Sequence, residues 1–467
     1  MADERPTQIE TSTAQRQAAA TGIVRSLRAA GFAAYFAGGC VRDLLLGREP
    51  KDFDVATSAS PDRVLEMFPR TFAVGAHFGV VLVVDLVADS SAEIVTEVAT
   101  FRNDGAYSDG RRPDAVRYTN SAEQDVQRRD FTINGLLLDP EIWERTGDLK
   151  SAVLDTVGGV ADLNAKNVRA IGDPTLRFAE DNLRMLRAVR FAVRLGFALD
   201  GETFAAIRAT ALQIHQVSNE RIRDELTRML TEGSARRAFE LLDATGLLAQ
   251  ILLEAARLKG VEQPPQYHPE GDVWTHTLML LEHLPPSPSA TLAWGALLHD
   301  IGKPATFRRA PDRIRFDGHV EIGVRIAQDI CARFRMSNED TAQILALVAN
   351  HMRFGDVEKM RASTLKRFLR LDRFNEHLAL HRLDCLSSHG DLRLYDYAKH
   401  HYDTVPPEEV RPQPLLTGDD LIAAGIKPGP QFRTLLHHVE DAQLEGRIHT
   451  REEALGLVAQ ITKAEII

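Results

Sequence analysis

Residues 38–47 read GGCVRDLLLG, and residues 51–57 read KDFDVAT. The two glycines follow the apolar run Phe32–Ala37, so the order predicts a buried strand, a tight turn and a helix. DFDV predicts a second strand, on which Asp52 and Asp54 point to the same face and converge on one or two divalent cations. Carboxylates suit Mg²⁺, which also takes substrate phosphates as ligands. The stretch therefore predicts a site for a nucleoside triphosphate and metal ions.

The residues around the aspartates extend this prediction. Gly38 and Gly39 lack a Cβ atom, so backbone N–H groups can approach a triphosphate, and Arg42 adds a charge-assisted contact to it. A third carboxylate completes such a site, and Glu97 in EVATF is favoured over Glu93. The alternative is a strand-to-helix turn with Arg42 exposed and a surface glutamate on a hairpin.

Length and composition limit the class of protein. A chain of 467 residues predicts two to four domains. The polar N-terminus, the absence of a long apolar run and three distant cysteines, Cys40, Cys331 and Cys385, predict a cytoplasmic protein that is not in a membrane. Net charge is −10, yet Lys166–Arg237 carries 13 Lys or Arg against 9 Asp or Glu. This excess indicates a track for a phosphate backbone, with solvated helix faces as the alternative.

The pattern changes along the chain. Strand and helix patterns alternate over residues 20–160, including a helix near 13–30 and a hairpin of GVVLVVDLV with AEIVTEVATF. From Thr175 onward the pattern is almost wholly helical. Turn residues predict breaks near 155–172 and 263–269.

Four motifs occur in a fixed order, and together they match a known family. They resemble the class II tRNA nucleotidyltransferase and bacterial poly(A) polymerase family. The resemblance implies that Asp52 and Asp54 bind Mg²⁺ and that Gly39 and Arg42 bind the nucleotide. The motifs are GGCVRDLLLG with KDFDVAT, EVATFR at 97–102, RRDFTINGL at 128–136 and FAEDNLRMLRAVRFA at 178–192.

RRDFTINGL is predicted to contact the sugar and phosphates. Arg128 or Arg129 suits phosphate or ribose, while Asp130 and Asn134 suit sugar hydroxyls. The family usually has Ala where this chain has Gly135, a change that affects no catalytic group. Without the other motifs, a basic strand entry with an Asn near a turn would be the simpler interpretation.

EDNLRMLRAVR predicts a helix that carries Asp181, Arg184, Arg187 and Arg190 at steps of three. A carboxylate accepts from the exocyclic amine of C or A, and a guanidinium donates to ring acceptors. The resemblance implies that Asp181 and Arg184 act as the template, with Arg187 and Arg190 as phosphate contacts. Without the other motifs, the alternative interpretation of this Asp/Arg pattern is a surface salt bridge.

The polar stretch between Arg102 and Asp125 resembles the family's flexible loop. The resemblance implies that this loop helps the pocket to switch from CTP to ATP.

A second constellation follows in the C-terminal half. WTHTLML and LAWGALLHDIGKP predict helices that carry histidines and carboxylates, which bind divalent transition metals. The set resembles the HD metal-dependent phosphohydrolase superfamily. This implies a site for Ni²⁺, Mn²⁺, Fe²⁺ or Mg²⁺ and a phosphatase or 2′,3′-cyclic phosphodiesterase activity; an inert helical platform is the alternative. The predicted ligands are His276, His299, Asp300 and Asp384, with His319 and His351 for a second metal or the scissile phosphate.

The predicted fold is an α+β nucleotidyltransferase head, a mixed sheet with helices, followed by all-α neck, body and HD domains. The predicted function is template-independent addition of CCA to the 3′ end of tRNA from CTP and ATP, with Mg²⁺ at the head. The alternatives are a poly(A) polymerase, an A-adding tRNA nucleotidyltransferase, an HD phosphohydrolase with a nucleotide-sensing head, and a noncatalytic RNA-binding protein. The sequence leaves monomer and dimer open. The predicted parts are a flexible N-terminus (1–20), the head (21–160), the neck (161–260), the HD domain (261–400) and a helical tail (401–467).

Overall fold

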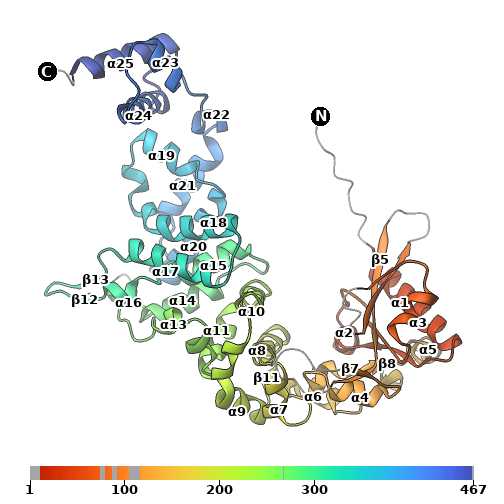
Figure 1. The fold of residues 1–467 in the computed structure, drawn as a ribbon. Helices are drawn as coiled ribbons and strands as arrows, with labels where there is room; N and C mark the ends of the chain where they lie inside the picture. Colours follow the sequence, from red (N-terminus) through yellow and green to blue (C-terminus); the bar gives the residue numbers. More distant parts are fainter. Residues whose placement is uncertain (1–10, 74–78, 87–91, 105–115, 267, 465–467) are drawn as a thin grey trace. The chain divides into compact units, whose positions relative to one another are not determined.

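The computed structural model describes residues 11–73, 79–86, 92–104, 116–266 and 268–464. The chain forms two compact units (Figure 1). One holds the residues up to Met229 together with Arg237–Leu253, and the other holds Leu230–Arg236 and the residues from Glu254 onward. The predicted head lies in the first unit and the predicted HD domain and tail lie in the second. The finer division of the chain stays a prediction.

A seven-stranded sheet forms the centre of the N-terminal part, with the strand order β3-β4-β5-β2-β1-β8-β9. β2 and β5 are parallel and the other neighbours are antiparallel, so the predicted mixed sheet is confirmed. β4 and β5 form the predicted hairpin. The strands are β1 (Ala34–Ala37), β2 (Val55–Thr57), β3 (Thr71–Phe72), β4 (Val80–Leu86), β5 (Glu93–Thr100), β8 (Leu137–Leu138) and β9 (Val153–Leu154).

Helix α1 (Thr13–Ala29) packs on β1 and β5. Its apolar residues recur at helical spacing, which buries Ile23, Val24 and Leu27. Gly31 follows with φ of +90°, a conformation that glycine adopts without strain, and the chain turns into β1. Residues 13–20, predicted as part of a flexible N-terminus, lie in α1, so this part of the prediction is wrong; residues 1–10 lie outside the described residues.

The predicted order of strand, tight turn and helix is confirmed. β1 ends at Ala37, Gly38 has φ of +72°, and α2 covers Gly39–Leu45. The strand predicted over residues 52–55 is wrong in its start, because β2 includes only the last of them. The Ala37 N–H still donates to the Asp54 carbonyl at 3.0 Å, so pairing with β1 reaches the second aspartate.

Helices make up most of the remaining first unit, as predicted for residues beyond Thr175. Most of α8 is buried, which makes it the central helix of this part. The further elements are α3 (Pro61–Met67), β6 (Arg102–Asp104), β7 (Val116–Tyr118), α4 (Ala122–Gln127), the 3₁₀ helix η2 (Thr132–Asn134), α5 (Pro140–Thr146), η3 (Lys150–Ala152), α6 (Gly159–Ala165), β10 (Asn167–Val168), α7 (Pro174–Glu180), α8 (Leu183–Leu195), β11 (Ala198–Leu199), α9 (Gly201–Thr210), η4 (Ala211–Gln216), α10 (Asn219–Thr231), α11 (Ala235–Ala244) and α12 (Leu247–Ile251).

In the second unit the apolar helix α15 lies at the centre and packs against α14, α18 and α20. All its residues from Thr291 to Leu298 are buried, so the following His299 is held inside the unit. The elements are α13 (Leu253–Ala256), α14 (Val273–Glu282), α15 (Ala290–Leu298), α16 (Lys303–Thr306), β12 (Arg308–Arg309), β13 (Ile314–Arg315), α17 (His319–Arg333), α18 (Asn338–Asn350), η5 (His351–Lys359), α19 (Ala362–Leu369), α20 (Phe374–Ser387), α21 (Arg393–Thr404), α22 (Pro407–Val410), α23 (Gly418–Ala423), α24 (Gln431–Leu444) and α25 (Arg451–Ala464).

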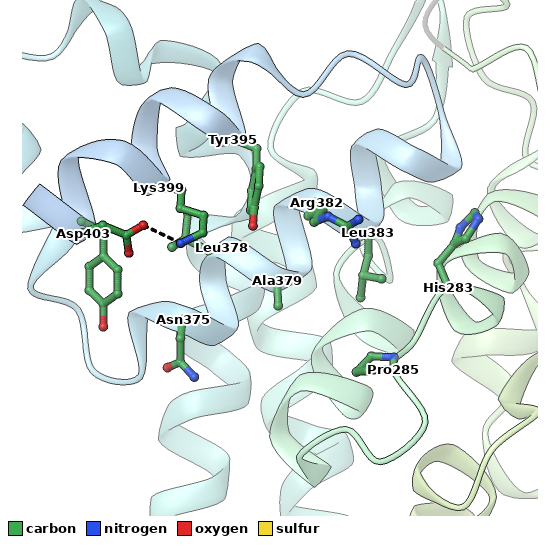
Figure 2. A pocket seen from close by; sticks show the side chains of 11 residues that line it. His283, Pro285, Asn375, Leu378, Ala379, Arg382, Leu383, Tyr395, Lys399 and Asp403 are labelled. Carbon is green, nitrogen blue, oxygen red and sulfur yellow. Dashed lines mark hydrogen bonds and ion pairs between the residues drawn. The ribbon is translucent and has the colours of Figure 1, made fainter.

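The C-terminal helices α23, α24 and α25 share an apolar core of their own, which includes Leu421, Leu435 and Val458. A cavity of about 370 Å³ lies between α20, α21 and the segment after α14 (Figure 2). The described residues that line it include none of the predicted site residues. Within the described ranges, every helix is too short or too polar to cross a bilayer.

Candidate active sites

Three carboxylates meet at the sheet. The parallel register pairs Val55 with Val98, which places the preceding residues, Asp54 and Glu97, beside each other. Burial, with repulsion first from Glu97 and then from Asp52, raises the pKa of Asp54 to about 7. Burial and Asp52 also raise the pKa of Glu97. The three residues form one acidic cluster, and a divalent cation would relieve the repulsion within it, so the donor set fits Mg²⁺.

Glu93, the alternative third carboxylate, lies on β5 four residues before Glu97 and therefore further from the cluster. It is exposed and accepts a hydrogen bond of 2.8 Å from Arg70. The geometry therefore favours Glu97 as the third carboxylate.

The glycine turn lies against the RRDFTINGL segment. A Cβ atom on Gly38 would lie 3.2 Å from the Arg129 guanidinium, and the positive φ adds strain for any side chain. Arg42 is only 3% exposed; it donates to Asn134 Oδ1 at 2.7 Å and to Asp43 Oδ1 at 2.8 Å. The alternative of an exposed Arg42 is wrong. Arg42 instead links the turn to η2, and its contact to phosphate stays a prediction.

Arg128 and Arg129 share one buried partner that the sequence analysis missed. Asp125 is 1% exposed and accepts from Arg128 at 2.6 Å and from Arg129 at 3.0 Å. Burial alone would raise the pKa of Asp125, but the two guanidinium groups outweigh it and lower the pKa. The spacing of three and four residues within one helical turn was the available signal.

Asp130 and Asn134 belong to a network that reaches helix α8. The Asn134 amide donates to Asp130 Oδ1 at 3.0 Å, and the Arg187 guanidinium donates to Asp130 Oδ2 at 3.0 and 2.8 Å. Burial would raise the pKa of Asp130, but Arg187 and the other partners lower it. The network brings Arg42, Asn134, Asp130 and Arg187 together, as four of the predicted site residues.

The single helix predicted over EDNLRMLRAVR is wrong in its start. α7 ends at Glu180, and α8 begins at Leu183, so Asp181 lies in the joint between them with an extended backbone. Asp181 accepts from Arg221 at 3.2 and 2.8 Å. Arg184, on α8, donates to Glu180 and, at 3.1 Å, to the Arg128 carbonyl. Asp181 caps the α8 backbone by accepting from Leu183, as short acidic side chains do outside helices.

Arg190 forms an ion pair with Glu225, and its guanidinium shares the Phe191 ring with those of Arg42 and Arg187. It is 4% exposed, and its Nε donates to Glu225 Oε2 at 2.5 Å. Its guanidinium also stacks 4.5 Å above the Phe191 ring. The position favours a structural role for Arg190 over the predicted phosphate contact. The stretch between Arg102 and Asp125, predicted as a flexible loop, contains the antiparallel strands β6 and β7 and the start of α4, so the prediction is wrong at both ends of the stretch; its residues 105–115 lie outside the described residues.

The six predicted HD ligands converge in the second unit, and we call them the HD centre. His276 Nε2 lies 3.1 Å from Asp384 Oδ1 and 3.3 Å from His299 Nε2. His319 Nε2 lies 3.4 Å from His351 Nε2. These residues come from α14, α20, α17 and the ends of α15 and α18, so tertiary packing assembles the HD centre.

Asp300 lies between the two halves of the HD centre. Its Oδ2 is 3.1 Å from His299 Nε2, and its Oδ1 is 3.8 Å from His319 Nε2 and 3.7 Å from His351 Nε2. Two groups of ligand atoms, each within 4.8 Å, therefore share this carboxylate. Nitrogen and carboxylate donors in this arrangement fit divalent transition metals, with room for one ion on each side of Asp300.

Lys303 is a further residue that the sequence analysis missed. Its Nζ lies 2.7 Å from Asp300 Oδ2 and donates to Gln263 Oε1 at 2.7 Å. Burial would raise the pKa of Asp300, but Lys303 and then His299 hold it well below its usual value. Lys303 lies in the HDIGKP stretch, three residues after Asp300, and this spacing could have predicted the contact between the two side chains.

Family models match three stretches of the chain. Residues 34–169 match the model described as Poly A polymerase head domain, and residues 196–258 match the model described as Probable RNA and SrmB-binding site of polymerase A. Residues 271–386 match the model described as HD domain. The acidic cluster lies in the first stretch and the HD centre lies in the third.

Similar proteins cover nearly the whole chain. The CCA-adding enzyme of Geobacillus sp. (strain WCH70) is 32% identical over 442 residues, 93% of this chain and 95% of that protein. The CCA-adding enzyme of Streptococcus thermophilus (strain CNRZ 1066) is 31% identical over 447 residues, 94% and 96% of the two chains. The solved structure of Bacillus stearothermophilus CCA-adding enzyme in complex with CTP has a TM-score of 0.72 at 25% identity, over 98% of this chain and 99% of that chain.

Proposed function

Because the chain belongs to the family of CCA-adding enzymes, we propose that it adds CCA to the 3′ end of tRNA from CTP and ATP. The observation that carries the proposal is the acidic cluster of Asp52, Asp54 and Glu97 in the chain's own fold. tRNA, CTP and ATP are then its substrates, and we place the activity in the cytoplasm, where tRNA matures.

The head chemistry follows from the cluster. Asp52, Asp54 and Glu97 would hold Mg²⁺, which would stabilise charge on the attacking and leaving oxygens. The 3′ hydroxyl of tRNA attacks the α-phosphate of the incoming nucleotide, the bond to the bridging oxygen breaks, and pyrophosphate leaves. Arg129, fixed by Asp125 beside Gly38, contacts the phosphates without having to reorganise.

Base selection falls to Asp181 and Arg184. Arg221 and the Arg128 carbonyl already orient these two side chains. A fixed carboxylate accepts from the exocyclic amine that C and A share, and a fixed guanidinium donates to their ring acceptors, so G and U are rejected. In this proposal, the stretch between Arg102 and Asp125 helps the pocket to switch from CTP to ATP.

The rival functions are disfavoured by specific observations. A poly(A) polymerase or A-adding enzyme would share the head motifs, but the two relatives that match nearly the whole chain are CCA-adding enzymes. A nucleotide-sensing head or a noncatalytic RNA-binding protein would have no use for three mutually repelling carboxylates.

Two variants test the head proposal. Asp52→Ala should abolish incorporation of CTP and ATP into a tRNA transcript that ends before CCA. Asp300→Ala, in the other unit, should leave incorporation at the level of the unchanged protein. Incorporation that survives Asp52→Ala in a folded protein would refute the role of the cluster.

We propose a second activity for the HD centre, the metal-dependent hydrolysis of phosphate esters at RNA ends. The observation that favours it is Asp300 between two histidine pairs. Ni²⁺, Mn²⁺, Fe²⁺ or Mg²⁺ would be held by the six ligands and would supply Lewis-acid activation of water. Lys303 adds a positive charge beside Asp300 that suits an anionic substrate.

The hydrolytic proposal is tested with RNA that ends in a 2′,3′-cyclic phosphate. The protein loaded with Mn²⁺ should open the ring, and Asp300→Ala should not, while Asp52→Ala should retain the activity. Equal hydrolysis by the protein and Asp300→Ala, or none by either with any of the four metals, would contradict the proposal and support an inert helical platform.

A further inference from the structure

His276 differs from the other histidines of the HD centre in the group that forms a hydrogen bond with its Nδ1 atom. His299, His319 and His351 each have Nδ1 close to the backbone carbonyl three residues earlier, at 2.9, 2.9 and 2.7 Å. His276 Nδ1 instead lies 2.7 Å from the carboxylate oxygen Oε1 of Glu270. Since carbonyl and carboxylate oxygens only accept, each of these Nδ1 atoms carries a proton, which leaves Nε2 as the nitrogen that can bind a metal.

Glu270 is built into the protein rather than exposed on it. Its side chain is 5% exposed, and its Oε1 also lies 2.9 Å from His268 Nδ1. The His268 and His276 rings meet edge to face with centroids 5.0 Å apart. The second carboxylate oxygen of Glu270, Oε2, is buried and has no hydrogen-bond partner among the residues that the structure describes. One carboxylate oxygen thus accepts from two imidazoles.

We propose that Glu270 is a positioning residue of the HD centre, and that His268 steadies it. The inference rests on the proposed binding of a divalent metal by His276. A backbone carbonyl three residues earlier orients the other three rings, whereas a carboxylate from outside α14 orients His276. A carboxylate acceptor fixes the ring and the tautomer and makes Nε2 a stronger donor to a metal.

Binding of Mn²⁺ to the full-length protein tests the proposal. We compare the unchanged protein with Glu270→Met, which removes the acceptor at similar size, and Glu270→Gln, which keeps a neutral acceptor. Glu270→Met should raise the apparent Kd for Mn²⁺ by roughly 10- to 100-fold. Glu270→Gln should raise it less, because a neutral acceptor makes a weaker hydrogen bond than a charged one. Glu282→Ala, at the exposed end of the same helix, is the matched control and should bind as the unchanged protein does.

The outcomes distinguish the proposed role of Glu270 from the proposed metal binding on which it rests. If the unchanged protein does not bind Mn²⁺, the metal function of the HD centre is wrong and the role of Glu270 is wrong with it. If the unchanged protein binds Mn²⁺ and either folded Glu270 variant binds with the same Kd, only the role of Glu270 is overturned. Incorporation of CTP by the head, together with circular dichroism, establishes that each variant is folded.

Discussion

The Arg187 guanidinium clamps one carboxylate oxygen of Asp130 with two hydrogen bonds, 3.0 and 2.8 Å long. Arg187 comes from α8, and Asp130 comes from the segment before η2. The other oxygen of Asp130 accepts from Asn134, which in turn accepts from Arg42 beside the glycine turn. The clamp therefore joins the helix that is proposed to select the base to the turn that is proposed to hold the triphosphate.

Arg187→Lys should weaken nucleotide addition although it preserves the charge. Lysine cannot reproduce the two-pronged contact, and one charge-assisted hydrogen bond contributes about 1.5–3 kcal/mol. We expect kcat/KM for CTP and for ATP to fall by about 10- to 100-fold. Arg208→Lys, exposed on α9, should have no effect. Unchanged kinetics of Arg187→Lys would mean that the clamp does not organise the site.

Glu225→Ala should lower stability because it leaves Arg190 buried without this carboxylate. Removing one partner of a buried ion pair costs about 3–5 kcal/mol in the free energy of unfolding. Glu66→Ala, in the exposed pair with Arg63, should change it by less than about 1 kcal/mol. Urea denaturation measures both. A Glu225→Ala protein of normal stability that has lost tRNA affinity would restore Arg190 as a phosphate contact.

The binding of Mg²⁺ at the head should weaken in acid. The pKa of Asp54 is raised to about 7 in the folded, metal-free protein, above the usual value of about 3.9 for an unfolded chain. Between these values the folded state holds the extra proton, so the stability of the metal-free protein falls as pH rises through this window. Protons compete with Mg²⁺ below about pH 7, and the increase in Tm that Mg²⁺ causes should be larger at about pH 8 than at about pH 6.

Glu97→Gln is the matched control for this pH dependence. It removes the carboxylate that contributes most to the raised pKa of Asp54 after burial. The midpoint of the Mg²⁺ effect should then move to lower pH. A Mg²⁺ effect that is equal at both pH values in the unchanged protein would contradict the raised pKa.

Arg221→Ala should reduce base selection. Arg221 holds the Asp181 carboxylate with two hydrogen bonds, and a well-oriented contact to a base edge discriminates by about 1–3 kcal/mol. We expect the ratio of CTP to UTP incorporation to fall by at least about tenfold, with Arg208→Ala as the control. If the ratio of CTP to UTP incorporation is unchanged while both incorporation rates fall equally, Asp181 positions the nucleotide without reading its base.

The sequence predicted the local parts of the fold and of both sites well. Alternation in the strand patterns predicted the β4–β5 hairpin, and the glycine pair predicted the turn before α2. The six ligands of the HD centre were predicted because the HDIGKP stretch and the histidines on either side of it resemble the HD superfamily. The signals for the hairpin and the turn lie within a few residues of each other, where periodicity and turn chemistry decide the structure.

The features that the sequence did not predict depend on partners that are distant in the chain, or on a local side-chain contact that competes with the helix. Arg190 and Glu225 lie 35 residues apart in the chain, on two different helices. The sequence near Arg190 contains no signal for this buried ion pair. Asp181 left the predicted helix because its side chain caps the next one. Glu270 gained its role only when folding brought His268 and His276 to the same oxygen.

The central claim is that one head site adds C, C and A in turn. The most direct measurement is the 3′-end sequence of a tRNA transcript that ends before CCA, after incubation with the protein, Mg²⁺, CTP and ATP. We predict that the products end in CCA and that addition stops there. Transcripts that carry a run of A, or that accept A only when they already end in CC, would contradict the claim.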